Sequence, residues 1–150
     1  MYSRQETARI KQSFWTSFGQ YMKPVPAAGG EKNSWVNYKT GIRHIYFRMT
    51  AEKDHASIAI ELANPSQQIR EIQYSQVMQF KTMLHKLSSD EWSWNMNAFD
   101  SNGMPISRIS QSLSGVNVLK ESDWPAIISF LKPRIVILDR FWEEIKYGFE

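Results

Sequence analysis

The residue with the clearest potential for chemistry is Glu61, which interrupts the apolar run in "DHASIAIELAN" (residues 54–64). Many metal-dependent nucleases hold Mg²⁺ with an Asp and with a Glu from a strand that ends in Glu-x-Lys. Here Ala63 stands at the lysine position, and Asp54 precedes Glu61 by seven residues. Seven residues of extended strand span about 23 Å, so these two carboxylates cannot share one ion. The pattern therefore favours a Glu that pairs with a basic or polar neighbour on the polar face of a sheet.

Other constellations that could carry chemistry are weak. The histidines His44, His55 and His85 lack the short helical spacing of a zinc motif, and the chain has no cysteine. The segment "AAGGEK" (residues 27–32) lacks the spacing of a P-loop. We therefore expect no metal and no cofactor, and we assign no catalytic residue. Whether the chain is an enzyme stays open, and these observations favour a protein without catalytic activity.

Length and composition restrict the class of protein. The chain has 150 residues, of which 42% are hydrophobic and 22% are charged, so we expect one folded globular domain over residues 1–150. The sequence has no apolar run of about 18 residues, and its polar start, "MYSRQETARI", lacks the apolar core of a signal peptide. These features predict a cytoplasmic protein that does not associate with a membrane.

Hydrophobic spacing and turn residues predict the regular elements. Ser3 and Glu6 have the spacing of a capping box ahead of apolar residues at helical intervals. Alternating apolar and polar residues predict strands, which "TAEKD" and "DSNG" connect into two hairpins. The predicted helices cover residues 4–22, 66–88 and 123–149, and the predicted strands cover residues 42–49, 56–62, 92–99 and 105–113, with "SWVNY" (34–38) as a candidate fifth strand.

Two of these segments carry more detailed expectations. Pro133 is predicted to kink the last helix or to split it in two. In the strand at 92–99, Trp92, Trp94 and Met96 are predicted to face the core. The predicted buried stripe of helix 66–88 consists of Ile69, Ile72, Val77, Phe80, Leu84 and Leu87.

The order of elements predicts an α+β fold. We expect an antiparallel sheet of four to five strands with helices on one face, in the order helix, optional strand, hairpin, helix, hairpin, helix. With the optional strand counted, this order is that of the core of PD-(D/E)xK nucleases, with Glu61 on the third strand. Such a remote likeness in the order of elements is weak support for a shared activity.

Two surfaces are candidates for binding. The first is a polar sheet face, whose Arg, Asn and Tyr side chains suit phosphate groups and base edges. The second is a basic surface, because residues 1–48 contain eight basic and only two acidic residues. The polar sheet face consists of His44, Tyr46, Arg48, Glu61, Asn95, Asn97 and Arg108, and the basic surface consists of Lys32, Lys39 and Arg43. Cross-strand pairs that solvate a sheet, and a solvated basic surface, are the structural alternatives.

The last predicted helix carries more apolar residues than one stripe against a sheet requires. Residues 135–149 contain nine large apolar or aromatic side chains. This surplus predicts a homodimer that uses the last helix or the first one.

Several motifs together give a resemblance to a known family. They are "FWTSFG" (14–19), "YFR" (46–48), "ASIAIEL" (56–62), Trp92 with Trp94, "SRI" (107–109) and "WPAII" (124–128). The set resembles the bacterial family known as domain of unknown function 4268, over nearly the whole chain. The resemblance implies an α+β domain without an established activity, which also occurs at the C-terminal end of longer proteins with nuclease-like segments. It implies no catalytic residues, and a glycine expected before the tryptophan strand is replaced here by Ser88-Ser89-Asp90-Glu91.

These observations lead to one main hypothesis and two alternatives. The main hypothesis is a non-catalytic binding or accessory module of the bacterial cytoplasm that is associated with DNA handling or restriction and has nucleic acid as a partner. One alternative is a degenerate metal-dependent nuclease, and the other is a self-associating structural protein. The surroundings of Glu61 distinguish the first two readings, because a metal enzyme needs a second carboxylate close to it.

Overall fold

The computed structural model describes residues 2–30 and 34–150. Its elements follow the predicted order without the optional strand. The strands are β1 (Ile45–Ala51), β2 (His55–Leu62), β3 (Ser93–Phe99) and β4 (Pro105–Ser114). The helices are α1 (Arg4–Met22), α2 (Gln67–Met78), α3 (Lys81–Ser88) and α4 (Trp124–Ile145), with short 3-10 helices at Glu121–Asp123 and Lys146–Phe149.

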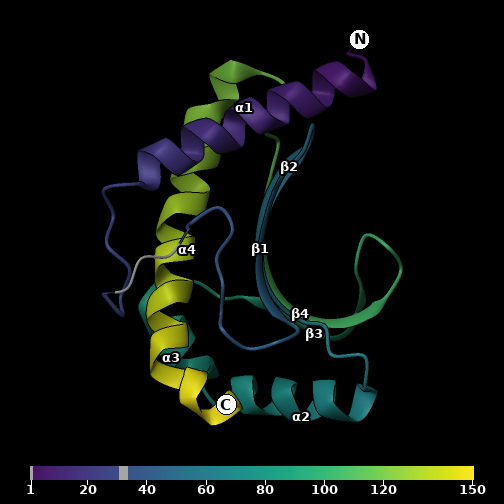
Figure 1. Cartoon of the computed structure of the whole chain (residues 1–150), viewed down its shortest axis with the longest axis vertical. Helices are drawn as coiled ribbons and strands as arrows, with labels where there is room; N and C mark the ends of the chain where they lie inside the picture. Colours follow the sequence, from purple (N-terminus) through teal and green to yellow (C-terminus); the bar gives the residue numbers. More distant parts are fainter. Residues whose placement is uncertain (1, 31–33) are drawn as a thin grey trace.

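The four strands form one sheet in the order β1-β2-β4-β3, and every neighbouring pair is antiparallel. The predicted α+β fold is therefore confirmed. The second strand of each hairpin lies in the middle of the sheet, so β1 and β3 are the two edges. Figure 1 shows this sheet almost edge-on, strongly curved, with the helices on its convex side and the concave side open.

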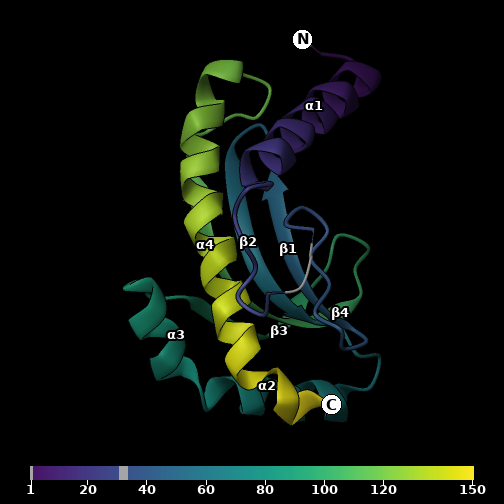
Figure 2. The ribbon, with the colours of Figure 1, turned by 60° about the vertical axis from the view of Figure 1, so that its left-hand side comes forward.

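The core fills the space between α4 and the convex face of the sheet. Figure 2 shows α4 running along the sheet, with α1 crossing one end and α2 and α3 lying at the other. Alternate strand residues such as Phe47, Ile58 and Ile109 point into this core, where they meet the buried stripe of α4. The described helices include none that is long and apolar enough to cross a membrane.

Helix α1 begins and packs as the sequence predicts. The hydroxyl of Ser3 accepts a hydrogen bond from the backbone N–H of Glu6, and the Glu6 carboxylate accepts one from the N–H of Ser3. This reciprocal capping box satisfies two N–H groups that the first turn leaves unpaired. Phe14, Phe18 and Met22 lie four residues apart and are fully buried, so one stripe of α1 joins the core.

The predicted single helix over 66–88 is wrong, because the structure has two helices there. The chain changes direction at Phe80, whose φ and ψ of −103° and 16° are not helical. Helix α2 then buries Tyr74 and Val77 whereas α3 buries Leu84, so the two segments do not share one stripe. Contrary to the prediction, Ile69, Ile72 and Leu87 are exposed.

Pro133 does not split the last helix, which continues from Trp124 to Ile145. A proline in a helix removes one N–H donor and leaves the carbonyl four residues earlier without its partner. Here that carbonyl belongs to Ser129, and both Pro133 and Ser129 are exposed. Water can therefore satisfy the carbonyl, and the buried residues on either side hold the helix together.

The candidate strand at 34–38 is not a strand. Its Trp35 is buried instead, and the indole Nε1–H donates to the backbone oxygen of Val25 over 3.1 Å. Among the described residues, one isolated bridge, between Lys39 and Tyr46, extends the sheet beyond β1. The strand β1 itself starts at Ile45 rather than at residue 42, since Gly41 and His44 have positive φ angles of 82° and 68° that interrupt an extended chain.

A β-bulge lies in β3 between Asn95 and Ala98. The buried hydroxyl of Ser107 donates to the carbonyl oxygen of Met96 over 2.7 Å, which satisfies a group that the bulge removes from the ladder. Met96 lies within this bulge, where the alternation is interrupted, so it is exposed and does not face the core as predicted. Trp92 and Trp94 keep the predicted contact with the core.

Candidate functional site

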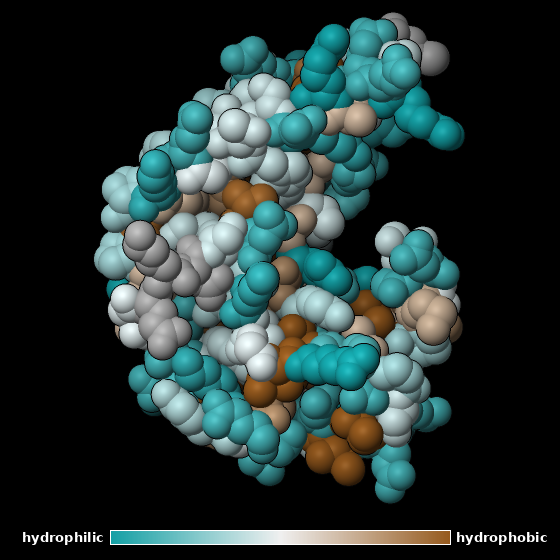
Figure 3. Space-filling model, viewed as in Figure 1, coloured by the Kyte–Doolittle hydropathy of each residue, from teal (hydrophilic) through white to brown (hydrophobic). Residues whose placement is uncertain are grey.

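The concave side of the sheet, which we call the open face, is formed by the strand residues that alternate with the core residues. The strand register places Tyr46, Glu61, Arg108 and Asn95 side by side in one row across the four strands. The next row contains Arg48, Ala59, Ser110 and Ser93, and the row after it contains Thr50, Ser57 and Ser112. Figure 3 shows a deep hollow in the molecule on this side.

Glu61 lies near the end of the interior strand β2 on the open face, between two arginines on neighbouring strands. Its Oε1 is 3.7 Å from Nε of Arg48, and its Oε2 is 3.5 Å from Nε of Arg108. The Glu61 side chain is 13% exposed, whereas Arg48 and Arg108 are 54% and 32% exposed. A ligand that approaches this face therefore meets the guanidinium groups before it meets the carboxylate.

Further contacts hold both arginines in place. The Cζ of Arg48 lies 4.2 Å from the centroid of the Tyr46 ring, which is a cation–π contact. Arg108 uses Nη2 to donate to the backbone oxygen of Phe99, the last residue of β3, over 3.0 Å. Arg48 approaches Glu61 through its Nε, and more than half of the Arg48 side chain is exposed, so its guanidinium group can still donate to a ligand.

The structure brings together five of the seven residues predicted for the polar sheet face: Tyr46, Arg48, Glu61, Asn95 and Arg108. His44 precedes β1, and its backbone oxygen accepts from Ala63 N–H over 2.8 Å. Asn97 lies in the β3 bulge, where the row pattern is interrupted, and its N–H donates to the Asn95 side chain. The role of these residues in binding stays a prediction.

The predicted basic surface is dispersed. Lys32 lies outside the described residues, and Lys39 and Arg43 are exposed in the segment that leads into β1. Elsewhere in the basic N-terminal third, Lys11 is tied to Glu52 by an ion pair of 2.6 Å that fixes α1 to the turn between β1 and β2. The basic excess therefore partly serves the fold.

The surroundings of Glu61 differ from those of a nuclease metal site. Over residues 2–30 and 34–150, no three His, Asp or Glu side chains come together in a way that could hold a metal ion. Asp54 pairs with its neighbour His55 over 2.8 Å, and this hydrogen bond lowers the pKa of the Asp54 carboxyl. Two arginines occupy the positions around Glu61 where a second carboxylate would be needed.

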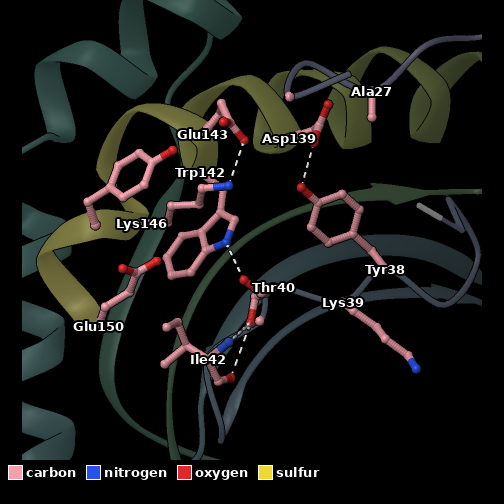
Figure 4. A pocket seen from close by; sticks show the side chains of 13 residues that line it. Ala27, Tyr38, Lys39, Thr40, Ile42, Asp139, Trp142, Glu143, Lys146 and Glu150 are labelled. Carbon is pink, nitrogen blue, oxygen red and sulfur yellow. Dashed lines mark hydrogen bonds and ion pairs between the residues drawn. The ribbon is translucent and has the colours of Figure 1, made fainter. Parts of the chain in front are cut away.

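A second polar cluster, centred on Asp139 of α4, was not found from the sequence. Asp139 is 3% exposed, and its two carboxylate oxygens accept from the Tyr38 hydroxyl over 2.5 Å and from the backbone N–H of Ala28 over 2.7 Å. One turn further along, Trp142 Nε1–H donates to the backbone oxygen of Thr40 over 2.8 Å. Figure 4 shows how Tyr38 and Trp142 link the segment before β1 to α4.

These contacts line a pocket of about 390 Å³ whose rim includes Glu143, Lys146 and Glu150. Burial, together with the hydrogen bond to Asp139, raises the pKa of Tyr38 well above its ordinary range. Tyr38 therefore stays protonated and acts as a fixed donor, not as a general base. Glu143 forms an ion pair with Lys146 over 3.0 Å, and Lys39 points away from Asp139 (Figure 4). The cluster attaches Ala28, Tyr38 and Thr40, which precede β1, to α4.

One signal in the sequence could have revealed this cluster. Ile135, Leu138, Asp139 and Trp142 have the spacing of one buried helical stripe, so an acid stands at a core position. A buried acid requires hydrogen-bond donors. The sequence does not identify those donors, because Ala28 and Tyr38 lie about a hundred residues earlier in irregular structure.

Comparisons with known proteins give one match. No curated protein and no solved structure is similar enough to match the chain. A family model, described as Domain of unknown function (DUF4268), matches residues 10–146, which include all four strands, all of α4 and most of α1. The resemblance noted in the sequence is therefore confirmed, and the chain belongs to the DUF4268 family.

Proposed function

We propose that this chain is a non-catalytic binding module that binds nucleic acid on its open face. The observation that carries the proposal is the arrangement of Arg48 and Arg108 around Glu61. Both arginines are more exposed than the carboxylate that orients them, so the surface offered to a partner is cationic. Such a surface is complementary to phosphate groups.

The other residues of the open face support the same class of partner. Asn95 and the hydroxyl residues of the face, Thr50, Ser57, Ser93, Ser110 and Ser112, can donate to phosphate and sugar oxygens or contact base edges. Several of them are short, so they do not fill the concave side of the sheet. An extended, anionic and hydrogen-bonding ligand suits such a surface better than an apolar one does.

The geometry of Glu61 favours binding over cleavage. Metal-assisted hydrolysis of a phosphodiester needs carboxylates that are free to ligate the ion. Glu61 is held between two guanidinium groups, and its partner in the sequence hypothesis, Asp54, is paired with His55 at the β1–β2 turn. These contacts support the module over the degenerate nuclease.

The test is a measurement of oligonucleotide affinity as a function of salt concentration. The variant Arg48→Ala/Arg108→Ala should bind at least about 10-fold more weakly at ~50 mM salt, and the slope of log K against log salt should flatten by about 1.4 to 1.8. The matched control is Lys86→Ala/Arg140→Ala, which removes the same charge from exposed positions on the helices. The control should stay within about 2-fold of the wild type.

Three results would reject the proposal. They are an absence of binding at ~50 mM salt, an equal loss of affinity in the control variant, and equally tight binding of poly-glutamate. The first would remove nucleic acid as a partner, the second would show that only net charge matters, and the third would indicate an acidic protein as the partner.

A further inference from the structure

We infer that the ligand of the open face is single-stranded nucleic acid, and that Arg48 stacked on Tyr46 is the platform for one of its bases. This inference rests on the proposed function and specifies its ligand. The geometry behind it is the 4.2 Å separation between Cζ of Arg48 and the centroid of the Tyr46 ring, both on the edge strand β1 beside Glu61.

The Arg48 side chain contacts Tyr46 and Glu61, and its remaining surface is exposed to solvent. The Tyr46 ring supports the guanidinium group, and Glu61 Oε1 lies 3.7 Å from its Nε. More than half of the Arg48 side chain nevertheless remains exposed. A planar group that is fixed in this way and still accessible has lost much of its rotamer freedom before a ligand arrives, so less entropy is lost on binding.

A guanidinium plane can stack on the face of a nucleobase as well as pair with phosphate. In a duplex both faces of almost every base are covered by neighbouring pairs, so this contact is available only to unpaired bases. Arg108 and Asn95 lie in the row that contains Tyr46, so groups suited to phosphate and to base edges flank the platform. The combination fits a single strand that crosses the sheet.

The conservative variant Arg48→Lys separates stacking from charge. Lysine keeps the positive charge but lacks the planar group, so it preserves attraction to phosphate and loses base stacking. Arg108→Lys is the matched control, because Arg108 contacts Glu61 and the Phe99 carbonyl and has no aromatic ring beneath it among its described contacts. Urea unfolding of both variants would verify that each is folded.

The experiment measures fluorescence anisotropy with a labelled single strand and with the duplex of the same length. The wild type should bind the single strand at least about 10-fold more tightly than the duplex. Arg48→Lys should weaken binding of the single strand by about 10-fold more than it weakens binding of the duplex, and the salt slope should stay nearly the same because the charge is kept. Arg108→Lys should change the ratio between the two affinities by less than about 2-fold.

The outcomes distinguish this inference from the proposed function. Equal affinity for the single strand and the duplex, or an unchanged ratio in Arg48→Lys, would overturn the inference while leaving a nucleic-acid-binding face. An equal change of the ratio in Arg108→Lys would also overturn it, since the effect would then not depend on the Tyr46 stack. An absence of binding to both forms would reject the proposed function itself.

Discussion

Two acidic side chains occupy opposite sides of the same sheet, and their partners differ in kind. Glu61 lies on the open face between two charged side chains, Arg48 and Arg108, which solvent can reach. Asp139 lies on the helix-covered side, and its two hydrogen-bond donors, Tyr38 O–H and Ala28 N–H, are neutral. On the open face the Glu61 carboxylate is therefore paired with charged groups, whereas on the covered side the Asp139 carboxylate is hydrogen-bonded by neutral donors.

This difference indicates that one carboxylate stabilises the fold and that the other orients side chains on a surface. If Asp139 is removed, the Tyr38 hydroxyl and the Ala28 N–H lose their acceptor, and the segment before β1 loses two of its attachments to α4. If Glu61 is removed, two arginines remain exposed and can be solvated. We therefore expect Asp139 to matter mainly for stability and Glu61 mainly for binding.

The largest expected effect is that of Asp139→Ala on the free energy of unfolding. Loss of the acceptor for two buried hydrogen bonds should lower this free energy by about 3 kcal/mol. Urea unfolding measures the loss, and Glu144→Ala, at an exposed position of α4, is the control with a change below about 0.5 kcal/mol. A loss below about 1 kcal/mol in Asp139→Ala would mean that water replaces the carboxylate, and the contrast with Glu61 would fail.

The pH dependence of stability tests the neutral partner of Asp139. Burial and the hydrogen bond to Asp139 raise the pKa of Tyr38 above its unfolded value of about 10. The unfolded chain therefore loses the Tyr38 proton first, so the contribution of this group is complete below pH 10 and decreases as the pH rises further. The difference in unfolding free energy between the wild type and Tyr38→Phe should shrink by about 1.4 kcal/mol between pH 8 and pH 11. Tyr147→Phe, at an exposed position, is the matched control, and a constant difference for Tyr38→Phe would contradict the assigned donor role.

On the open face, Glu61→Gln should increase affinity for an oligonucleotide. Glutamine keeps an oxygen acceptor for the arginines and removes one negative charge from beneath the binding surface. If a phosphate binds about 7 Å from the Glu61 carboxylate, their repulsion at a high effective dielectric corresponds to about a 3- to 5-fold change in affinity at low salt. Anisotropy titration at ~50 mM and ~300 mM salt checks both the increase and its decay with salt. A Mg²⁺-dependent nuclease activity that disappears in this variant would instead support the enzyme alternative.

The smallest expected effect is the coupling energy between Arg48 and Glu61 in a double-mutant cycle. The Nε to Oε1 distance is 3.7 Å and Arg48 is half exposed, so the pair should contribute about 0.5 kcal/mol to the unfolding free energy. Urea unfolding of Arg48→Ala, Glu61→Ala and the double variant gives this value. A coupling energy above about 2 kcal/mol would mean that the Arg48–Glu61 pair stabilises the fold about as much as the Asp139 contacts do. The contrast between the two carboxylates would then be wrong.

The homodimer predicted from the apolar surplus of the last helix stays a prediction, but the structure offers another account of those residues. Helix α4 is the central helix of the fold, with the sheet on one side and contacts to α1 and α3. Phe141, Trp142 and Ile145 are buried inside the chain. Most of the surplus is therefore explained without a second copy, and the mass in solution, from light scattering, would test what remains.

Local patterns predicted most of the fold because their causes are local. The capping box at Ser3 and Glu6, the alternation in both hairpins and the turn at 100–103 all act within a few residues. The sequence assigned Tyr46 and Glu61 to the same polar face, and the structure pairs these two residues across β1 and β2. The break at Phe80 was missed because α2 and α3 bury different faces, which depends on distant partners, the sheet for one and α4 for the other.

By itself the sequence determined the α+β class, both hairpins, the first and last helices, and a polar sheet face that contains Arg48, Glu61 and Arg108. Period and alternation are properties of neighbouring residues, so they can be read along the chain. Tertiary structure alone decided that β2 and β4 lie side by side, which brings Arg108 to Glu61, and that Asp139 meets Tyr38 and Ala28. The separation in sequence is 47 residues between Glu61 and Arg108, 101 between Tyr38 and Asp139, and 111 between Ala28 and Asp139. Their partners are selected by the packing of the whole chain, which no local pattern encodes.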